Sequence, residues 1–215
     1  MHIVVVGAGI LGASTGFHLA RAGAQVTIVD QAHDGRATAA GAGIVCPWVS
    51  GAEDAAFYRL YVEGARYYGE LVPALAELGV TDLGFRRVGA LVVSHDADEL
   101  AAFNEVLSRR RADTPEMGAT SLLSPRETRA LFPPLRAELA GLHVANGARV
   151  DGRRMAAGLL RAARGLGAKA IEAHADLIAG GNRVTGVRLR DATLRDRAFR
   201  RFGRPPARYF TSVYG

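Results

Sequence analysis

The first thirty residues combine two short strand-like segments with a helix-like segment between them. Residues 3–6 form a continuous apolar run, which is typical of a parallel strand covered on both faces. We expect residues 10–22 to form a helix that Gly23 ends, and residues 25–29 to form a second strand. The pattern therefore predicts a βαβ unit at the start of an α/β fold.

The middle of the chain alternates between helical and extended patterns. Apolar and aromatic side chains recur at helical spacing across residues 54–78, which predicts a helix that Pro73 kinks or splits. We expect a strand over 85–94, a helix that begins at Asp96 or Asp98, and a strand over 141–150.

Helix-capping signals recur in the second half of the chain. Ser124-Pro-Arg-Glu127 is a capping box with proline at the first helical position, so a short helix is expected there. Asp151 is expected to cap a helix that ends at Gly165 or Gly167. Residues 168–172 predict a third strand of the first sheet, and residues 175–189 predict a hairpin.

This order of elements predicts a discontinuous domain. Residues 1–45 and 150–189 are expected to build one Rossmann-like α/β nucleotide-binding domain, because the chain leaves it near residue 45 and returns near residue 150. Residues 46–149 form an insertion on the substrate side. Residues 190–215 are a basic tail of atypical composition.

The formal net charge of +6 is concentrated at one end of the chain. Residues 1–187 contain 19 basic and 19 acidic side chains, whereas residues 188–215 contain eight arginines against Asp191 and Asp196. The body of the protein is therefore electrically balanced, and no nucleic-acid partner is expected for it.

Several further features limit the class of protein. Cys46 is the single cysteine, so no disulfide within the chain is expected and a reducing cytoplasm fits. No apolar run reaches the ~18 residues of a membrane span. No signal peptide is expected, because Met1 leads directly into a strand. The histidines occur singly, without the spacing of a metal site, so no metal is expected.

A glycine pattern lies at the first strand–helix turn. In Gly7-Ala-Gly-Ile-Leu-Gly12, the first glycine allows a tight turn and Gly9 lets the backbone approach a pyrophosphate. Gly12 lets the helix pack closely on the sheet, and Asp30 ends the second strand, where it can accept hydrogen bonds from ribose hydroxyls. A nucleotide is therefore expected at Gly7, Ala8, Gly9, Ile10, Leu11, Gly12 and Asp30.

The identity of the dinucleotide stays open at this point, because Asp30 suits NAD as well as FAD. The segment 31–45 is rich in small residues, which let a backbone lie flat against a bulky ligand. A flexible loop has the same composition, so this segment alone does not decide whether a ligand is bound.

Four segments occur in a distinctive order: Gly7-Ala-Gly-Ile-Leu-Gly12, Ala39-Ala-Gly-Ala-Gly-Ile44, Val150-Asp-Gly-Arg-Arg-Met155 and Arg183-Val-Thr-Gly-Val187. Together they resemble the FAD-dependent D-amino-acid oxidase and dehydrogenase family, which includes glycine and sarcosine oxidases. The resemblance covers residues 1–190 approximately, and its order and spacing make it more specific than the glycine motif alone.

The resemblance implies a flavoprotein with FAD as cofactor, which removes hydride from the Cα–H of a small amino-acid substrate of the D-amino-acid, glycine or sarcosine type. The resulting imine hydrolyses to a keto acid and ammonia. The resemblance further implies that Thr38 lies along the pyrophosphate and that Ala175 contacts adenine through its backbone. The remaining cofactor contacts that it implies come from Asp30, Gln31, Gly41, Ala42, Gly43 and Ile44.

The resemblance stops near residue 190. Family members continue with an alanine- and glycine-rich strand that returns to the cofactor, whereas this chain continues with the arginine-rich tail. The arginine and tyrosine that grip the substrate carboxylate in this family lie in the missing half, so no catalytic residue is assigned. We interpret the tail as the product of a frameshift or a premature end in the gene, and a native basic tail is the alternative.

Three functions fit these observations. The first is an FAD-dependent amino-acid oxidoreductase, represented by its N-terminal portion, without a membrane span but compatible with peripheral contact to an electron acceptor. The second is an NAD-dependent dehydrogenase, which the segment 39–44 and the return near residue 150 disfavour. The third is a non-catalytic nucleotide-binding fragment, with apolar surface uncovered where further segments would pack.

Overall fold

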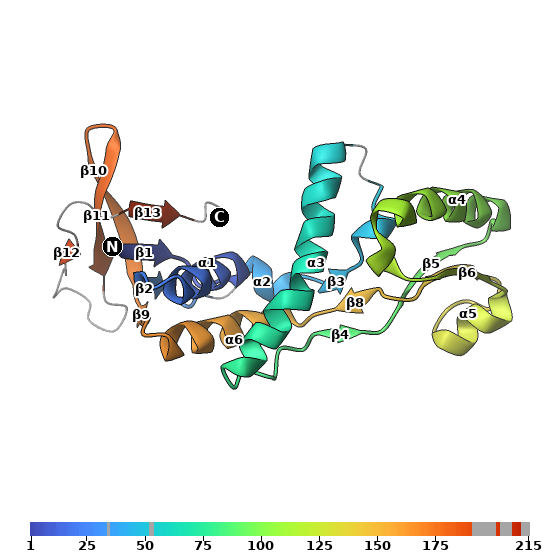
Figure 1. The fold of residues 1–215 in the computed structure, drawn as a ribbon, viewed down its shortest axis with the longest axis horizontal. Helices are drawn as coiled ribbons and strands as arrows, with labels where there is room; N and C mark the ends of the chain where they lie inside the picture. Colours follow the sequence, from blue (N-terminus) through green and yellow to red (C-terminus); the bar gives the residue numbers. More distant parts are fainter. Residues whose placement is uncertain (34, 52–53, 191–200, 203–207, 212–215) are drawn as a thin grey trace. The chain divides into compact units, whose positions relative to one another are not determined.

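The computed structural model describes residues 1–33, 35–51, 54–190, 201–202 and 208–211. The chain divides into two compact units (Figure 1). The first unit comprises residues 1–42, 74–84 and 151–215, and the second unit comprises residues 43–73 and 85–150. The helix α3 (Ala55–Glu77) contributes residues to both units.

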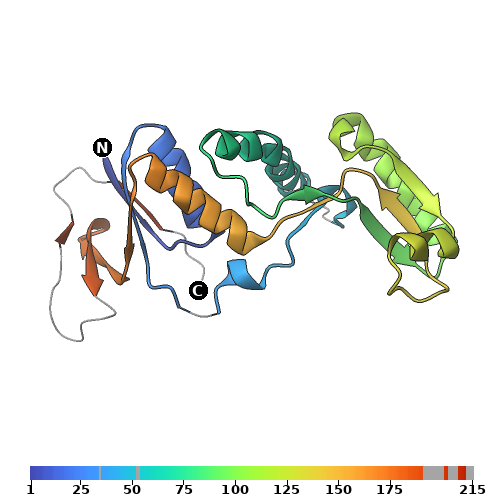
Figure 2. The same cartoon turned by 90° about the horizontal axis from the view of Figure 1, so that it is seen from below.

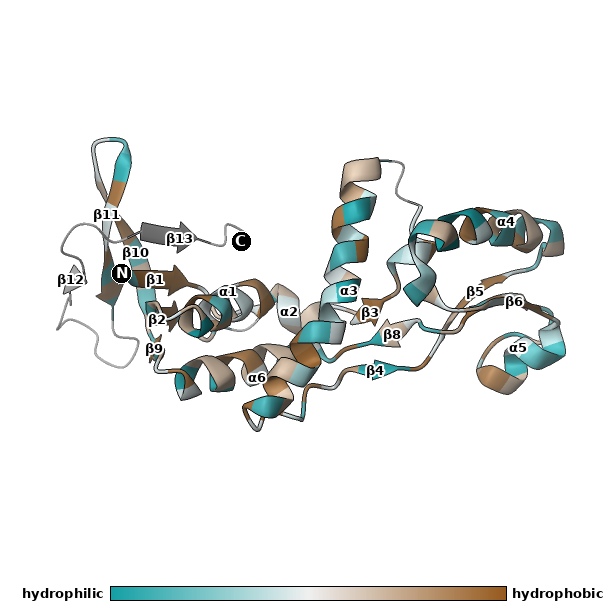
Figure 3. Ribbon diagram, in the orientation of Figure 1, coloured by the Kyte–Doolittle hydropathy of each residue, from teal (hydrophilic) through white to brown (hydrophobic). Residues whose placement is uncertain are grey.

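A parallel sheet with the strand order β13–β1–β2–β9 forms the centre of the first unit. The β1–β2 pair confirms the predicted βαβ unit, and β9 confirms the predicted third strand. β1 and β2 are brown in Figure 3, because their residues are mostly hydrophobic. The strands are β1 (His2–Val6), β2 (Gln25–Asp30), β9 (Lys169–Glu172) and β13 (Arg208–Thr211).

Two helices, α1 (Ile10–Arg21) and α6 (Gly152–Gly165), lie side by side against this sheet (Figure 2). α1 packs directly on β2, since a Cβ at Gly16 would lie 2.5 Å from Cδ1 of Ile28. Phe17 and Leu159 are both fully buried in this region. Burying each such side chain stabilises the fold by about 1.5–3 kcal/mol relative to leaving it exposed.

The predicted C-terminal end of α1 and the predicted N-terminal cap of α6 are both confirmed. α1 ends before Gly23, whose φ of +81° is a conformation that glycine adopts without strain. The Asp151 carboxylate caps α6 by accepting hydrogen bonds from the backbone N–H groups of Arg153, at 3.0 Å, and Arg154, at 3.1 Å. The Asp151 cap thus satisfies two backbone N–H donors that have no partner within the helix.

Residues 74–84 belong to the first unit, although the sequence pattern assigned them to the insertion. Val80 and Leu83 are buried against α6, where a Cβ at Gly158 would lie 3.1 Å from Val80 and 2.5 Å from Leu83. The pattern did not reveal this division, because one continuous helix crosses the boundary between the units and helical periodicity does not mark such a boundary.

The predicted hairpin is confirmed as β10 (His174–Gly180) and β11 (Arg183–Arg190), which pair in antiparallel fashion. Its tip is teal in Figure 3, and Gly181 makes the turn with a φ of +64°. Val187 and Leu189 of β11 are buried in one cluster with Val4 of β1. The hairpin thus packs on the same core as the parallel sheet.

The second unit contains two small antiparallel sheets, β3–β8–β4 and β5–β7–β6. Its buried core includes Leu107, Met117 and Leu142, none of which is exposed to solvent. The strands are β3 (Ile44–Val45), β4 (Arg86–Arg87), β5 (Ala90–Ser94), β6 (Thr120–Leu123), β7 (Ala140–Val144) and β8 (Ala148–Arg149). The further helices are η1 (Pro47–Val49), α4 (Ala97–Asp113), η2 (Pro115–Met117) and α5 (Pro125–Leu131), while the short α2 (Ala37–Ala40) belongs to the first unit.

Two predicted strands are wrong as continuous elements. The segment 85–94 is divided into β4 and β5, and the segment 141–150 is divided into β7 and β8. At the break, Gly89 has a φ of +77°, and a Cβ at Gly147 would lie 2.6 Å from Cβ of Ala90. Because the two backbones cross so closely, a regular ladder cannot continue through this point, and each segment moves from one sheet to the other.

The helices predicted for the second unit are confirmed. Pro73 lies inside α3, so the helix is not split there. Asp96 caps α4 by accepting from the backbone N–H groups of Asp98 and Glu99. The capping box of α5 is present, and the hydrogen bond from the Ser124 hydroxyl lowers the pKa of Glu127.

The backbone of the tail is described only where it forms β12 (Arg201–Phe202) and β13. β12 pairs with β11, and β13 runs parallel to β1. The frameshift interpretation depends mainly on residues 191–200 and 203–207, which lie outside the described residues.

We expect Gly12→Ala to destabilise the first unit by about 1–3 kcal/mol, the range for overpacking. The added Cβ would lie 2.0 Å from the carbonyl oxygen of Gly7, so either the turn or the helix must move. Gly69→Ala is the matched control, since Gly69 lies in α3 with nothing within 4 Å of its added Cβ. Thermal unfolding followed by circular dichroism should show a lower midpoint for Gly12→Ala alone, and equal midpoints would contradict the packing described here.

Cys46 offers a probe of the second unit. Its side chain is 3% exposed, and burial raises the pKa of its thiol to about 11. We expect a thiol reagent at mildly alkaline pH to label the folded chain far more slowly than the urea-unfolded chain, because the thiolate is the reactive form. Equal labelling rates in both states would show that this core is not formed in solution.

Candidate cofactor-binding site

The loop after β1 is shaped by two glycines. Gly7 has a φ of +98°, and its backbone N–H donates to the carbonyl of Val29 on β2, at 2.7 Å. Gly12 lies so close to the Gly7 carbonyl that no side chain fits between them. The predicted roles of these two glycines, in the turn and in the approach of the helix, are therefore confirmed.

The N-terminus of α1 is open to an anion. Gly9 is its N-cap and offers no side chain as a cap, and the first turn contains no acidic residue. The N–H of Ile10 donates to Oγ1 of Thr38 at 2.9 Å. A helix start with its positive dipole end and no acidic residue in its first turn suits a pyrophosphate, so these residues fit a dinucleotide.

The Asp30 carboxylate at the end of β2 is held from two sides. Oδ2 accepts from the N–H of Ala8 at 2.6 Å, and Oδ1 accepts from the N–H of Ala32 at 2.7 Å. Ala32 is the one non-glycine residue with positive φ in the described part of the chain, at 52°. Arg36 approaches Oδ1 at 3.5 Å. A carboxylate has about four lone-pair sites, so this fixed group can still accept from a ribose hydroxyl.

A cavity of about 150 Å³ lies beside Asp30 in the first unit. Its walls come from the ends of β1 and β2, from the residues that follow them, from Ala173 after β9, and from the start of β10. The residues that line it are Val6, Gly7, Val29, Asp30, Gln31, His33, Ala173, His174 and Ala175. Gly7, Asp30, Gln31 and Ala175 are thus brought together as the sequence led us to expect, and a mostly apolar cavity with one fixed carboxylate suits an adenosine.

Sequence reasoning missed the histidines of this cavity. His174 Nδ1 lies 2.7 Å from Oε1 of Gln31, and His174 Nε2 lies 3.1 Å from Oδ1 of Asp176. Arg190 donates to the other oxygen of Asp176 at 2.7 Å. This chain of contacts links the end of β2 to the hairpin. In the sequence, His174 could have been noticed because it directly precedes Ala175, which is the predicted adenine contact.

Thr38 connects the starts of two helices. Besides binding the N–H of Ile10, it lies against α6, where a Cβ at Gly152 would lie 2.8 Å from the Thr38 carbonyl oxygen. Gly41 and Ala42 follow directly after α2. A cofactor contact from Thr38, Gly41 or Ala42 remains a prediction.

Gly43 and Ile44 lie in the second unit. Gly43 has a φ of +70°, and its carbonyl accepts from the N–H of Val150 at 2.8 Å. A Cβ at Gly43 would lie 1.9 Å from the Val150 carbonyl oxygen, so glycine is required by the backbone itself. Ile44 begins β3 and is 67% exposed. Their position along a flavin also remains a prediction.

Two further observations concern other kinds of site. Within the residues that the structure describes, no three His, Cys, Asp or Glu side chains gather as ligands of one metal ion would. In the same part of the chain, no helix combines the length and the apolar character needed to cross a membrane.

Comparison with known proteins identifies the cofactor. Residues 2–201 match the model of the FAD-dependent oxidoreductase family known as DAO. The chain belongs to this family. Its cofactor class is therefore FAD, which decides between the two dinucleotides that Asp30 alone left open. The resemblance to FAD-dependent amino-acid oxidases is confirmed.

Individual relatives agree with this assignment. The chain is 45% identical over 184 residues to the uncharacterized oxidoreductase YurR of Bacillus subtilis (strain 168), covering 86% of this chain and 50% of YurR. The crystal structure of iminodiacetate oxidase (IdaA) from Chelativorans sp. BNC1 superposes with a TM-score of 0.84 at 43% identity, covering 96% of this chain and 54% of IdaA. Glycine oxidase from Bacillus cereus ATCC 14579 shares the fold, with a TM-score of 0.70 at 22% identity and coverages of 86% and 50%. The chain thus spans about half the length of these relatives.

Replacing Asp30 tests the ribose contact. We expect Asp30→Asn to weaken FAD binding about tenfold to about a hundredfold, because a hydrogen bond to a charged group contributes about 1.5–3 kcal/mol. Quenching of FAD fluorescence on titration with protein gives the affinity. Asp82→Asn is the matched control, since Asp82 pairs with Arg154 at the surface and does not line the cavity. An unchanged affinity in Asp30→Asn would remove this carboxylate from the FAD site.

Proposed function

We propose that this chain provides the FAD-binding part of an enzyme that oxidises the Cα–N bond of an amino acid. The observation that carries the proposal is the fixed Asp30 carboxylate beside the glycine loop and the start of α1. It is supported by the 43% identity to a protein described as iminodiacetate oxidase, since iminodiacetate is itself an amino acid with a secondary amine.

FAD, when bound, supplies the two-electron chemistry by accepting hydride from the substrate carbon next to nitrogen. The chain's own residues bind and orient it. In this proposal the N–H groups at the start of α1 hold the pyrophosphate, Asp30 holds the ribose, and the backbone at Ala175 lies against adenine. The loop Gly41–Ile44 then extends from the pyrophosphate toward the flavin ring. We place the reaction in the cytoplasm, which suits a chain whose single cysteine forms no internal disulfide.

A second candidate function is a nucleotide-binding fragment without catalysis. Large hydrophobic side chains of the second unit are exposed, among them Ile44 at 67%, Phe57 at 56% and Leu60 at 71%. They line one mostly apolar cavity with Tyr61 and Tyr68. Uncovered apolar surface of this kind favours a chain that needs further protein to complete a substrate site.

Anaerobic reduction of the bound flavin separates the two functions. The chain is loaded with FAD, freed of excess cofactor, and mixed with glycine, sarcosine, D-alanine or iminodiacetate. We expect the visible absorbance of oxidised flavin to fall with at least one of these amino acids, because hydride transfer reduces the ring.

Dithionite is the control that shows the bound flavin to be reducible. A chain that binds FAD and is bleached by dithionite, but by none of the amino acids, would contradict the enzymatic proposal and favour the binding fragment. A chain that binds no FAD would contradict both functions.

A further inference from the structure

The ring of His174, at the start of β10, lies between two groups that accept hydrogen bonds. Its Nδ1 is 2.7 Å from Oε1 of Gln31, and its Nε2 is 3.1 Å from Oδ1 of Asp176. Neither an amide oxygen nor a carboxylate has a proton to donate. A neutral imidazole donates from one nitrogen only, whereas an imidazolium donates from both. These contacts therefore match the protonated, positively charged ring.

Asp176 requires a donor from His174 because it is a carboxylate. Burial raises the pKa of Asp176, but the contacts with His174 and Arg190 outweigh this effect and lower the pKa overall. Arg190 of β11 donates to Oδ2 at 2.7 Å, which leaves Oδ1 for the ring. Nε2 of His174 therefore keeps its proton toward Asp176 in either charge state, and Nδ1 is the nitrogen that gains or loses one.

Other charged or titratable groups also surround the ring. They come from every element beside it: Asp30, His33 and Arg36 at and after the end of β2, Glu172 of β9, and Arg188 and Arg190 of β11. Asp30 and Arg36 approach each other at 3.5 Å, and Arg188 lies opposite Asp176 in the hairpin register. His174 is half exposed, so its ring exchanges protons with solvent.

Gln31 can meet either charge state of His174, because the two ends of its amide have the same shape. With its oxygen toward Nδ1 of His174, its Nε2 lies 3.2 Å from Nδ1 of His33, to which it can donate. When His174 loses its Nδ1 proton, two acceptors face each other. Half a turn of the amide then places the NH2 group on His174 and the oxygen toward His33. The orientation of Gln31 is thus linked to the proton on His174.

We propose that His174 is a positioning residue that links FAD binding to pH through the orientation of the Gln31 amide. Gln31, His33 and His174 all line the cavity beside Asp30. The protonated ring fixes the amide in one orientation and adds a positive charge to a site for a cofactor with two anionic phosphates. FAD therefore binds best to the protonated state, and its affinity rises as pH falls through the titration of His174. This inference rests on the proposed FAD site at Asp30.

The pH profile of FAD affinity tests the linkage. The dissociation constant is measured by quenching of FAD fluorescence between about pH 6 and about pH 8.5, at constant ionic strength. We expect affinity to be at least about fivefold higher at the acid end, as for a coupling between two binding events. His174→Gln should abolish this dependence. His95→Gln is the matched control and should retain it, because His95 is an exposed histidine of the second unit.

Two substitutions of Asp176 separate positioning from a merely structural role. Asp176→Asn removes the negative charge that favours the imidazolium, so the midpoint of the pH profile should move to lower pH. Asp176→Glu keeps a carboxylate and should restore the midpoint of the unaltered chain. A structural role alone would change the affinity but not the midpoint. Circular dichroism shows whether each variant folds.

Nuclear magnetic resonance tests the first half of the linkage without FAD. In the ¹⁵N-labelled chain, the His174 ring signals are identified by their loss in His174→Gln. We expect both ring nitrogens to carry protons at the acid end, and the side-chain NH2 signals of Gln31 to shift with the same midpoint as the ring.

Two results would overturn the proposal. One is a set of Gln31 NH2 signals that does not follow the titration of His174. The other is an FAD affinity whose pH midpoint is the same in Asp176→Asn as in the unaltered chain. Absence of FAD binding at every pH would contradict the proposed function together with its link to pH, while the resonance titration would still decide whether His174 orients Gln31.

Discussion

The close approach of α1 to the loop after β1 is the constraint on which the FAD site depends. Gly12 has no side chain where the Gly7 carbonyl passes, and Gly16 has none where Ile28 of β2 packs. The helix can therefore lie directly on the strands, with its first N–H groups at their carboxyl ends. Asp30 reaches the same point from β2 and fixes the loop through the N–H of Ala8. One steric condition thus gathers the pyrophosphate donors and the ribose acceptor in one place.

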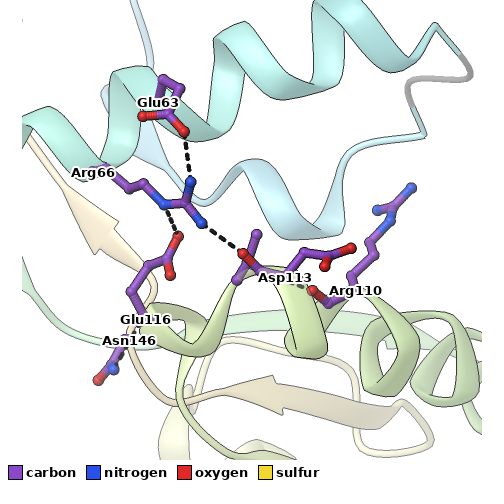
Figure 4. Close-up of polar contacts among 7 residues, drawn as sticks. Glu63, Arg66, Arg110, Asp113, Glu116 and Asn146 are labelled. Atoms are coloured by element: carbon purple, nitrogen blue, oxygen red, sulfur yellow. Dashed lines mark hydrogen bonds and ion pairs between the residues drawn. The ribbon is translucent and has the colours of Figure 1, made fainter.

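The second unit is organised by arginines that connect separate elements. Arg66 joins α3 to η2 and to the end of α4 (Figure 4), and Arg110 joins α4 to η1 while stacking on Tyr58, with its guanidinium carbon 4.6 Å from the ring centroid. Exposed ion pairs alone contribute little to stability. Both arginines also donate to backbone carbonyls, however, so they hold loops whose polar groups would otherwise lack partners.

The sequence predicts the elements whose causes are local. The βαβ unit, the caps Ser124 and Asp151 and the hairpin turn each depend on residues within a few positions of one another. The breaks at Gly89 and Gly147 were not predictable in this way, because each is caused by the backbone of the other, about sixty residues away along the chain.

The same distinction applies to the candidate sites. Asp30 and the glycine loop follow from a spacing, whereas His174 joins them only through the fold. Gln31 and His174 lie far apart in the sequence, so no periodicity could have grouped them into one hydrogen-bonded network. The Gly41–Ile44 loop shows the converse case, since its composition suggested a ligand and the structure requires glycine at position 43 for a backbone contact with Val150.

A crystal structure of the chain with FAD would show whether Asp30 and the start of α1 hold the cofactor. We expect the ribose hydroxyls within hydrogen-bond distance of the Asp30 carboxylate, with the pyrophosphate at the start of α1 and adenine beside Ala175. FAD bound at any other surface, or bound with Asp30 facing only its present backbone partners, would contradict this expectation.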